Sequence, residues 1–504
     1  MTEIRYTSTR DASVDVPASY AILQGISKEG GLFVPKTMPE LDLDWSVLKD
    51  ASYQSIASLV LGAFLTDFSQ EEIEACVNAA YDEKFSDPAI APLKRLDQDL
   101  YVLELFHGPT IAFKDMALTI LPHLLLKAAQ KQGCQDEIVI LTATSGDTGK
   151  AALAGFADVD QTKILVFYPK GGVSEIQEKQ MVTQAGNNVK VFAIKGNFDD
   201  AQTAVKEIFN DQALQATLAD QGKRFSSANS INIGRLMPQV AYYVWTYAQM
   251  VKNGLEPGQE IDVVVPTGNF GNILAAHYAR AIGTPIGKLV CAANENNVLV
   301  DFFNQGLYDK NRPFYLTSSP SMDILVSSNL ERLVYELVDT DSQYLGQLMT
   351  DLNQQGIYQL TAEHLKKAEG FYADFATQDQ VSSAIASVFE NHHYLMDPHT
   401  AVAYVVGQGY RQVTEEAQAP LVIVSTASPY KFPRSVMSAF GSVKDQDDFD
   451  LLAAIHQKSG LSLPEAVSSL QKAPVLHEET IQIDQMVGKI LDFIQVNHEE
   501  ETND

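Results

Sequence analysis

Cysteine is scarce in this 504-residue chain, and its positions suggest no pairing. The three cysteines, Cys76, Cys134 and Cys291, are odd in number, scattered and free of any Cys-x-x-Cys motif. Such a set argues against a disulfide framework and against a cysteine-based zinc site, and it is typical of a reducing compartment. We therefore expect a cytoplasmic protein.

Positive charge is also in short supply. The chain has 36 lysines and arginines against 64 aspartates and glutamates, which leaves a formal net charge of −28. Because the phosphates of nucleic acids are bound through basic patches, we expect no nucleic-acid partner. An anionic ligand would have to be held by local groups, such as helix N-termini, arginine or lysine, against an unfavourable overall field.

Long apolar runs are absent as well. No run approaches the roughly 20 residues that a membrane-spanning helix needs. The N-terminus, MTEIRYTSTRDASVDV, lacks the apolar segment of a secretory signal, so we expect no membrane partner. Hydrophobic residues still make up 45% of the chain. That supplies a large core, and chains of this length usually fold as two or three domains.

From about residue 100, short apolar runs alternate with amphipathic stretches across loops rich in glycine, serine and threonine. The runs are DEIVILTA, KILVFYP, NVKVFAI, IDVVVPT, KLVCAAN and PLVIVSTAS. This alternation predicts an α/β fold with parallel sheets covered by helices. We expect an N-terminal segment (1–98), two α/β domains (99–255 and 256–445) and a mainly helical C-terminal part (446–504).

The stretch HGPTIAFKDM, residues 107–116, places Lys114 directly after an apolar Ile-Ala-Phe and before a mostly apolar run. Lysines beside apolar residues usually pack their stem and keep the ammonium in water. A desolvated lysine instead loses its proton readily and can form a Schiff base. Pro122 lies in the run that follows, so a helix there should bend or be interrupted.

The loop TATSGDTGKAAL, residues 142–153, resembles a nucleotide-binding P-loop only superficially. A Walker A loop would need glycine at position 144 and serine or threonine at position 151, where this chain has Thr144 and Ala151. What remains is a polar helix start whose backbone N–H groups can hold a carboxylate or a phosphate. Asp147 in this loop could also be a simple helix N-cap.

Two further loops follow predicted strands. PTGNFGNILAA, residues 266–276, has two glycines three apart, which let the backbone approach a phosphate at a helix start, although a structural turn would look the same. It is not Gly-x-Gly-x-x-Gly, so a dinucleotide is not favoured. STASPYKFP, residues 425–433, offers hydroxyls that either satisfy the loop or bond a neutral heterocyclic nitrogen. A lysine, a phosphate cradle, an anion loop and a hydroxyl together suit pyridoxal phosphate.

Several motifs occur in one order along the chain. YTSTR and GISKEGGLFVP come first, and HGPTIAFKD, TSGDTG, SSANSINIGRLMPQ, GNFGN, MDILVSSNLER, DPHTAVA and STASPYKF follow. In this order they resemble the threonine synthases of the longer bacterial and fungal type, through nearly the whole chain. The resemblance implies fold type II of the pyridoxal enzymes, related to the tryptophan synthase β chain. We therefore expect two open, twisted, mainly parallel sheets, with the lysine and the substrate loops in the first α/β domain.

The resemblance also implies roles for individual residues. Lys114 would bind the cofactor as a Schiff base and act as the catalytic base, and Thr426 would face the pyridine nitrogen. The cofactor phosphate would be held in the second α/β domain by Gly268, Asn269, Phe270, Gly271 and Asn272.

The implied reaction converts O-phospho-L-homoserine and water to L-threonine and phosphate, the last step of threonine biosynthesis. For the substrate phosphate we choose a helix start with hydroxyl and amide donors followed by an arginine fork: Ser227, Asn229, Ser230, Asn232 and Arg235. For the amino-acid end of the substrate we choose Thr144, Ser145, Gly146, Asp147 and Thr148. Arg235 could instead pair with an acidic neighbour at the surface, and Lys431 could serve an anion or merely the surface.

Two other functions stay open. One is a threonine synthase-like phospho-lyase that releases a keto acid, and the other is a non-catalytic phosphate-binding α/β protein. His107, His399 and the pair His392-His393 match no common ligand spacing, so we expect no metal and interpret each as a hydrogen-bonding residue near a loop. We expect a monomer or a homodimer.

Overall fold

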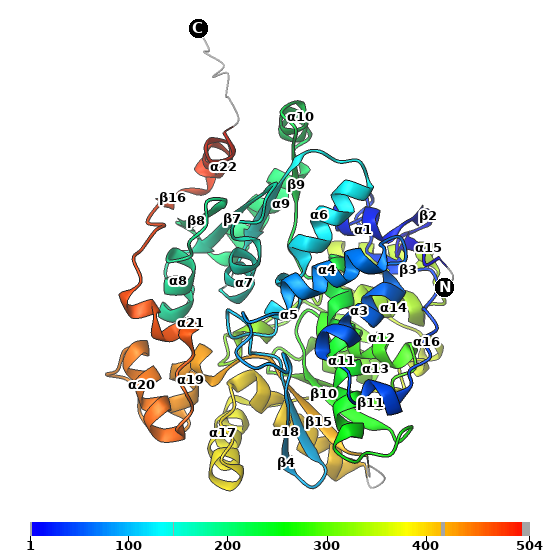
Figure 1. Ribbon diagram of the computed structural model, residues 1–504, viewed down its shortest axis with the longest axis vertical. Helices are drawn as coiled ribbons and strands as arrows, with labels where there is room; N and C mark the ends of the chain where they lie inside the picture. The colour runs from blue at the N-terminus through cyan, green and yellow to red at the C-terminus, as the bar shows by residue number, and fades with distance from the viewer. Residues whose placement is uncertain (1–2, 145, 415–418, 496–504) are drawn as a thin grey trace.

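The apolar runs form two separate sheets in the computed structural model, which describes residues 3–144, 146–414 and 419–495 (Figure 1). The smaller sheet is parallel, in the order β16-β8-β7-β6-β9. Its strands are β6 (Glu137–Ala143), β7 (Thr162–Pro169), β8 (Val189–Ile194), β9 (Lys223–Ser226) and β16 (Thr480–Ile481). The predicted α/β class with mainly parallel sheets is confirmed.

The larger sheet runs β14-β11-β10-β15-β5-β4 and is parallel except for its edge strand β4. Its strands are β4 (Leu93–Asp97), β5 (Leu100–Glu104), β10 (Ile261–Pro266), β11 (Ile286–Ala293), β14 (Phe371–Phe375) and β15 (Leu421–Ser425). Strand β10 is buried along its whole length, because helices cover both faces of the sheet.

Helices sandwich each sheet. Around the smaller sheet lie α7 (Asp147–Phe156), α8 (Glu175–Val182), α9 (Phe198–Asn210), α10 (Gln212–Asp220) and α22 (Met486–Ile494). Around the larger sheet lie α11 (Ile233–Lys252), α12 (Gly271–Ala281), α13 (Val298–Gln305), α17 (Gln378–His392) and α18 (Pro398–Val413). Within the described ranges, no helix is both long enough and apolar enough to cross a membrane.

The remaining elements lie outside these two layers. The N-terminal segment contains β1 (Tyr6–Ser8), β2 (Asp11–Val16), β3 (Phe33–Pro35), α1 (Ala18–Gln24), α2 (Trp45–Leu48), α3 (Tyr53–Phe64) and α4 (Gln70–Ala80). A lobe beside the larger sheet contains β12 (Leu307–Asp309), β13 (Ile357–Gln359), α14 (Leu330–Leu337), α15 (Ser342–Gln354) and α16 (Ala362–Lys366).

The run after Lys114 forms two helices, α5 (Asp115–Leu118) and α6 (Leu121–Lys131), rather than one. Pro122 occupies the first turn of α6, where its missing N–H costs no helical hydrogen bond. The predicted interruption is therefore confirmed.

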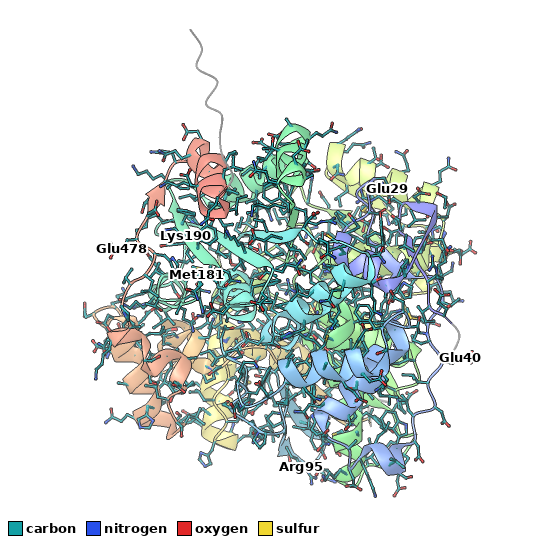
Figure 2. All side chains as sticks on the ribbon, turned by 45° about the horizontal axis from the view of Figure 1, so that its top comes forward. Glu29, Glu40, Arg95, Met181, Lys190 and Glu478 are labelled. Atoms are coloured by element: carbon teal, nitrogen blue, oxygen red, sulfur yellow. The ribbon has the colours of Figure 1, made fainter. Side chains whose placement is uncertain are left out.

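The two sheets do not divide the chain at a single point. Strand β5, which the sequence analysis placed in the first α/β domain, pairs with β15 in the larger sheet. Strand β16, from the mainly helical C-terminal part with α19 (Pro433–Ser438), α20 (Asp448–Ser459) and α21 (Glu465–Ser468), pairs with β8 in the smaller one. Figure 2 labels Glu478 next to this strand and Lys190 on β8, and Lys190 Nζ lies 2.7 Å from Glu479 Oε1. The domain limits themselves remain predictions.

Candidate active site

The loop that carries Lys114 is fastened to the loop that follows β15. The Phe113 N–H donates to the carbonyl of Thr426 at 2.8 Å, and the Ser428 N–H donates to the carbonyl of Ile111 at 3.0 Å. Because these loops lie at the carboxyl end of the larger sheet, they are where an open α/β fold binds its ligands.

A buried carboxylate sets the shape of the lysine loop. Asp115 accepts hydrogen bonds from the N–H of Thr110 at 2.8 Å and from its hydroxyl at 2.6 Å. A Cβ at position 108 would overlap the Asp115 side chain, so only Gly108 permits this packing. Burial raises the pKa of Asp115, and the bonds from Thr110 oppose that rise. The loop is thereby held in one conformation, with Lys114 at the start of α5.

The Lys114 side chain is largely buried. It is 12% exposed, and Nζ lies 3.7 Å from Asp147 Oδ2 and 3.4 Å from the Ser321 hydroxyl. Burial lowers the pKa of Lys114, Arg235 and Lys431 lower it further, and Asp147 opposes them. The structure therefore gives this lysine the surroundings of a reactive amine rather than those of a surface charge.

Asp147 is not a helix N-cap. Gly146 occupies that position of α7 with a φ of 135°, and a Cβ there would overlap the Gln177 side chain. The Asp147 carboxylate instead accepts from Gln177 Nε2 at 2.9 Å and from the Ser321 hydroxyl at 3.0 Å. Burial alone would raise the pKa of Asp147, but Lys431, together with the Lys114 amine, lowers it well below its usual range.

Lys431 is wholly buried, so its interpretation as a surface residue is wrong. Its ammonium lies 3.4 Å from Asp147 Oδ1 and donates to the Thr110 carbonyl at 3.0 Å and to Gln180 Oε1 at 2.8 Å. Two lysines therefore share one carboxylate.

Sequence reasoning missed a polar chain behind Ser321. The Ser321 N–H donates to His399 Nε2 at 3.1 Å, and the other ring nitrogen lies 2.6 Å from the Asp397 carboxylate. Since Nε2 accepts, the proton of a neutral His399 ring belongs on Nδ1, facing Asp397. Asp397 is the N-cap of α18 and so fixes both the helix start and the ring. The Asp-Pro that opens DPHTAVA was the local signal for this cap.

The turn from residue 268 to 272 opens α12 at the end of β10. A Cβ on Gly268 would lie 2.8 Å from the carbonyl of Ser321, and Phe270 has a left-handed φ of 66°. Asn272 accepts from the hydroxyls of Tyr242 at 2.7 Å and Tyr243 at 2.5 Å. Its buried Nδ2 has no hydrogen-bond partner in the part of the chain that the structure describes.

Another residue of the turn, Asn269, is hydrogen-bonded to Asn329. The Asn269 carbonyl accepts from the backbone N–H of Asn329 at 3.0 Å and from its side chain at 3.1 Å, while Gly271 begins α12. The hydroxyl of Thr426 has no partner among the described side chains and backbone groups, so it can bond an incoming ring nitrogen.

Arg235 is 4% exposed, and burial lowers its pKa to about 10. One guanidinium nitrogen donates to the Ala228 carbonyl at 2.9 Å, and Nε has no partner among the described residues. No ion pair joins Arg235 to a described carboxylate, which counts against the interpretation as a surface ion pair. A buried guanidinium with a free N–H suits an anion.

The other residues chosen for the substrate phosphate differ in whether their polar groups already have hydrogen-bond partners. Asn232 caps α11: its Oδ1 accepts from the Gly234 N–H at 2.8 Å and its Nδ2 donates to the Ile22 carbonyl at 2.9 Å, so the amide is already engaged. Asn229 is exposed, and Ser227 accepts its N–H at 3.1 Å. The Ser230 hydroxyl lies at the outer limit of hydrogen bonding, 3.4 Å from that of Ser328.

The loop before α7 is held by Thr144. Its hydroxyl accepts from the N–H groups of Gly146 at 3.0 Å and Gly149 at 2.9 Å. Thr148 is half-buried on the same turn, and Ser145 lies outside the described residues. Thr144 thus shapes the anion loop.

His107, His392 and His399 make the predicted hydrogen bonds near loops, whereas the His393 side chain is exposed and has no hydrogen-bond partner among the described residues. His107 lies 2.9 Å from a Glu104 carboxylate oxygen, and His392 Nδ1 lies 3.2 Å from the Leu96 carbonyl. The described residues contain no cluster of histidine, cysteine and carboxylate side chains suited to a metal ion.

These groups together fit a phosphorylated aldehyde. A buried amine of lowered pKa could take the aldehyde, an unpartnered Asn272 amide and a helix N-terminus could hold the phosphate, and the hydroxyl of Thr426 could bond the ring nitrogen. Gly268 lies so close to the carbonyl of Ser321 that the turn at 268–272 has no room for a larger side chain at this position.

Three family models match the chain. "Threonine synthase N terminus" matches residues 5–81, "Pyridoxal-phosphate dependent enzyme" matches residues 88–426, and "Threonine synthase, C-terminal" matches residues 400–483.

Individual relatives agree with these models. Threonine synthase-like 1 of Homo sapiens is 39% identical over 451 residues, covering 86% of this chain, which spans 60% of that relative's length. Threonine synthase of Schizosaccharomyces pombe is 36% identical over 473 residues, 88% of this chain and 90% of that protein. A crystal structure of PLP-bound threonine synthase from Brucella melitensis superposes with a TM-score of 0.86 at 34% identity, over 98% of this chain and 100% of that one.

Proposed function

The chain belongs to the threonine synthase family of pyridoxal-phosphate-dependent enzymes, of fold type II, and we propose that it makes L-threonine and phosphate from O-phospho-L-homoserine and water. It would thus be a carbon–oxygen lyase of the last step of threonine biosynthesis. The observation that carries this proposal is the Lys114 amine, buried between Asp147 and Ser321.

The residues that would hold the cofactor come from three loops. Lys114 would bind its aldehyde covalently, Thr426 would face its ring nitrogen, and the turn Gly268, Asn269, Phe270, Gly271 and Asn272 would hold its phosphate. When bound, pyridoxal phosphate supplies an electron sink for negative charge at the substrate α carbon.

The residues of the chain then handle protons and orientation. A lysine amine of lowered pKa is unprotonated closer to neutral pH, so Lys114 Nζ can take the proton from the α carbon and later return one. Asp147 and Ser321 hold that nitrogen in place, which keeps the proton transfer short.

We infer that the substrate phosphate lies on Arg235, helped by Ser227, Asn229 and Ser230. Asn232 supports this loop as a helix cap rather than as a ligand, because both of its amide atoms are engaged. The amino-acid end of the substrate would meet the anion loop at Thr144, Ser145, Gly146, Asp147 and Thr148.

A phospho-lyase that releases a keto acid is a second candidate. The same buried amine and the same loops would serve both reactions. A non-catalytic phosphate-binding protein is disfavoured, because phosphate binding alone does not require a buried amine.

The deciding experiment is product analysis after incubation of the purified, pyridoxal-phosphate-loaded chain with O-phospho-L-homoserine. Threonine and phosphate in equal amounts would support the proposal, whereas a keto acid with ammonia would establish the second candidate. Both candidates would be refuted if the protein, mixed with the cofactor, showed no absorbance near roughly 410–420 nm and if borohydride left no cofactor attached to the peptide that contains Lys114.

We also propose a cytoplasmic location and a monomeric or homodimeric state. The cysteines support the location, because all three are free in the structure and two of them, Cys76 and Cys291, are buried.

A further inference from the structure

Two lysines face one carboxylate from opposite sides. Lys431 Nζ lies 3.4 Å from Asp147 Oδ1, and Lys114 Nζ lies 3.7 Å from Asp147 Oδ2. One negative charge cannot neutralise two ammonium groups in a site that is this well buried, so one lysine is left with an incomplete counter-charge.

The donor count separates the two lysines. An ammonium has three N–H donors. Lys431 has three acceptors within reach, namely Asp147, the Thr110 carbonyl and Gln180 Oε1, and its side chain is wholly buried. Lys114 faces only Asp147 and the Ser321 hydroxyl among the described residues, and its side chain keeps 12% exposure. A proton therefore leaves Lys114 at lower cost than it leaves Lys431.

We propose that Lys431 is a positioning residue that stays charged on Asp147 and thereby makes Lys114 the lysine that gives up its proton. This deepens the proposed function, on which it rests for the role of Lys114. Lys431 does not touch the reacting atoms in this account, because it acts through the Asp147 carboxylate.

The other charges around Lys114 are consistent with this assignment. The elements packed against it contribute Asp147 from α7, Arg235 from α11, Lys431 from the 3-10 turn at 429–431, and Asp115 from α5. Arg235 adds a further positive charge, so loss of the Lys114 proton brings the cluster closer to neutrality. Burial, Arg235 and Lys431 all lower the pKa of Lys114.

The test measures how fast acetic anhydride labels Lys114 in the full-length chain, freed of cofactor, as the pH is varied. Mass spectrometry of the peptide that contains Lys114 gives the rate. Lys431→Met should slow labelling about tenfold at a pH where most Lys114 amines of the wild-type protein are still protonated. The reason is that Asp147 then pairs with Lys114 alone and stabilises its ammonium form. Lys431→Arg keeps the charge and should restore the wild-type rate.

Two more variants complete a double-mutant cycle between Asp147 and Lys431. Asp147→Asn removes the carboxylate that lies 3.7 Å from Lys114 Nζ and should speed labelling of Lys114. Asp147→Asn/Lys431→Met removes both charges and should return the rate close to wild type, and it still tests the idea if Lys431→Met does not fold. The matched control is Lys179→Met, which removes a half-buried lysine from the helix that carries Gln177 and Gln180, and should leave the rate unchanged.

An unchanged or faster rate in Lys431→Met, or no acceleration in Asp147→Asn, would overturn the proposal. The measurement needs neither substrate nor turnover. If no threonine forms but the labelling cycle behaves as stated, the proposed function fails and the role of Lys431 stands.

Discussion

Lys114 and Arg235 are both buried cations, yet their partners differ in a way that suits different tasks. Lys114 has a carboxylate within 3.7 Å and a lowered pKa, so it can change its charge. Arg235 pairs with no described carboxylate, and at a pKa of about 10 it stays charged at neutral pH. A group that can change its charge and a group that keeps its charge thus lie near one another.

Lys114→Ala should lower the turnover rate by a factor of at least about a thousand, because it removes both the covalent attachment of the cofactor and the base. Initial rates of phosphate release from O-phospho-L-homoserine measure this. Turnover near the wild-type level would end the assignment of Lys114.

Arg235→Ala should weaken binding of O-phospho-L-homoserine by about 2–3 kcal/mol, the typical loss for a charge-assisted bond to an anion, and change cofactor binding much less. The measurements are the KM for the substrate and a fluorescence titration with pyridoxal phosphate. If cofactor binding falls instead, Arg235 belongs to the other phosphate.

Because of Asp147, the free energy of unfolding should fall at acid pH. Its folded pKa is depressed, so its contribution is fully present above the unfolded value near 3.8 and is lost as pH falls through the folded value. Asp147→Asn should therefore lower the free energy of unfolding by about 3 kcal/mol at neutral pH, with the deficit shrinking below about pH 4. Urea unfolding at several pH values checks this, and a deficit that does not depend on pH would contradict it.

Sequence reasoning could find the residues that have a local signal. Lys114 follows an apolar triplet, the 268–272 turn has two glycines, and Arg235 opens an amphipathic helix. Ser321 and Gln177 could not be found, because each is an ordinary polar residue whose meaning depends on loops that meet only in the fold.

At the scale of elements, α14 joins parts of the chain that lie far apart in sequence. Arg332 is wholly buried and donates to the carbonyls of Phe33 at 2.9 Å and Ile231 at 2.5 Å, and to the side chain of Asn329. Asn329 in turn donates to the Asn269 carbonyl in the turn at 268–272. The Arg332 side chain thus joins the N-terminal segment, the loop before α11 and this turn.

The same helix is clamped by the N-terminal segment on its outer side. Glu331 accepts from Arg10 at 2.9 and 2.7 Å and from the Thr9 hydroxyl at 2.6 Å. Two residues of the YTSTR motif, Thr9 and Arg10, thus hold α14 in place beside the turn at 268–272.

Arg332→Met should destabilise the fold by about 3 kcal/mol, since the buried carbonyl of Phe33 and the partly buried carbonyl of Ile231 lose their donor. It should also weaken pyridoxal phosphate binding at least about tenfold, because Asn329 is no longer held on the turn. Thermal unfolding and a cofactor titration measure the two effects. Arg95→Met on the exposed edge strand β4 (Figure 2) is the control and should change neither. Wild-type cofactor affinity in Arg332→Met would show that the turn does not need this support.

Element prediction succeeded where burial on both faces left continuous apolar runs, as in β6, β7 and β10. It failed for sheet membership. Strand β5 precedes the smaller sheet in sequence but pairs with β15, and the two-residue β16 has no pattern to read. Pairing across 300 residues leaves no local trace, so only the folded chain reveals it.

At the scale of the whole molecule, the chain leaves the larger sheet and returns to the smaller one at its end. Figure 1 shows the C-terminal segment running from α20 and α21 along one side of the molecule to β16 and α22. Helix α22 packs Met486, Ile490, Leu491 and Ile494 against the face of the smaller sheet that α9 also covers. Asp147 and Gln177, which contact the Lys114 site, are carried by the opposite face of that sheet, on α7 and α8.

A truncation after residue 477 tests whether the smaller sheet depends on this segment. It removes β16 from the edge of β8 and exposes the apolar face that α22 covers. The expected cost is on the order of 10 kcal/mol, since several large buried side chains are lost and each is worth about 2–5 kcal/mol. Calorimetry should then show two transitions, because the larger sheet keeps the apolar cluster around Val264, Val290 and Ile423 while the smaller one melts early. Ile490→Ala, which leaves the backbone intact, should lower the melting temperature without splitting the transition. A truncated protein with one transition at the wild-type temperature would mean that the smaller sheet is stable without its C-terminal cover.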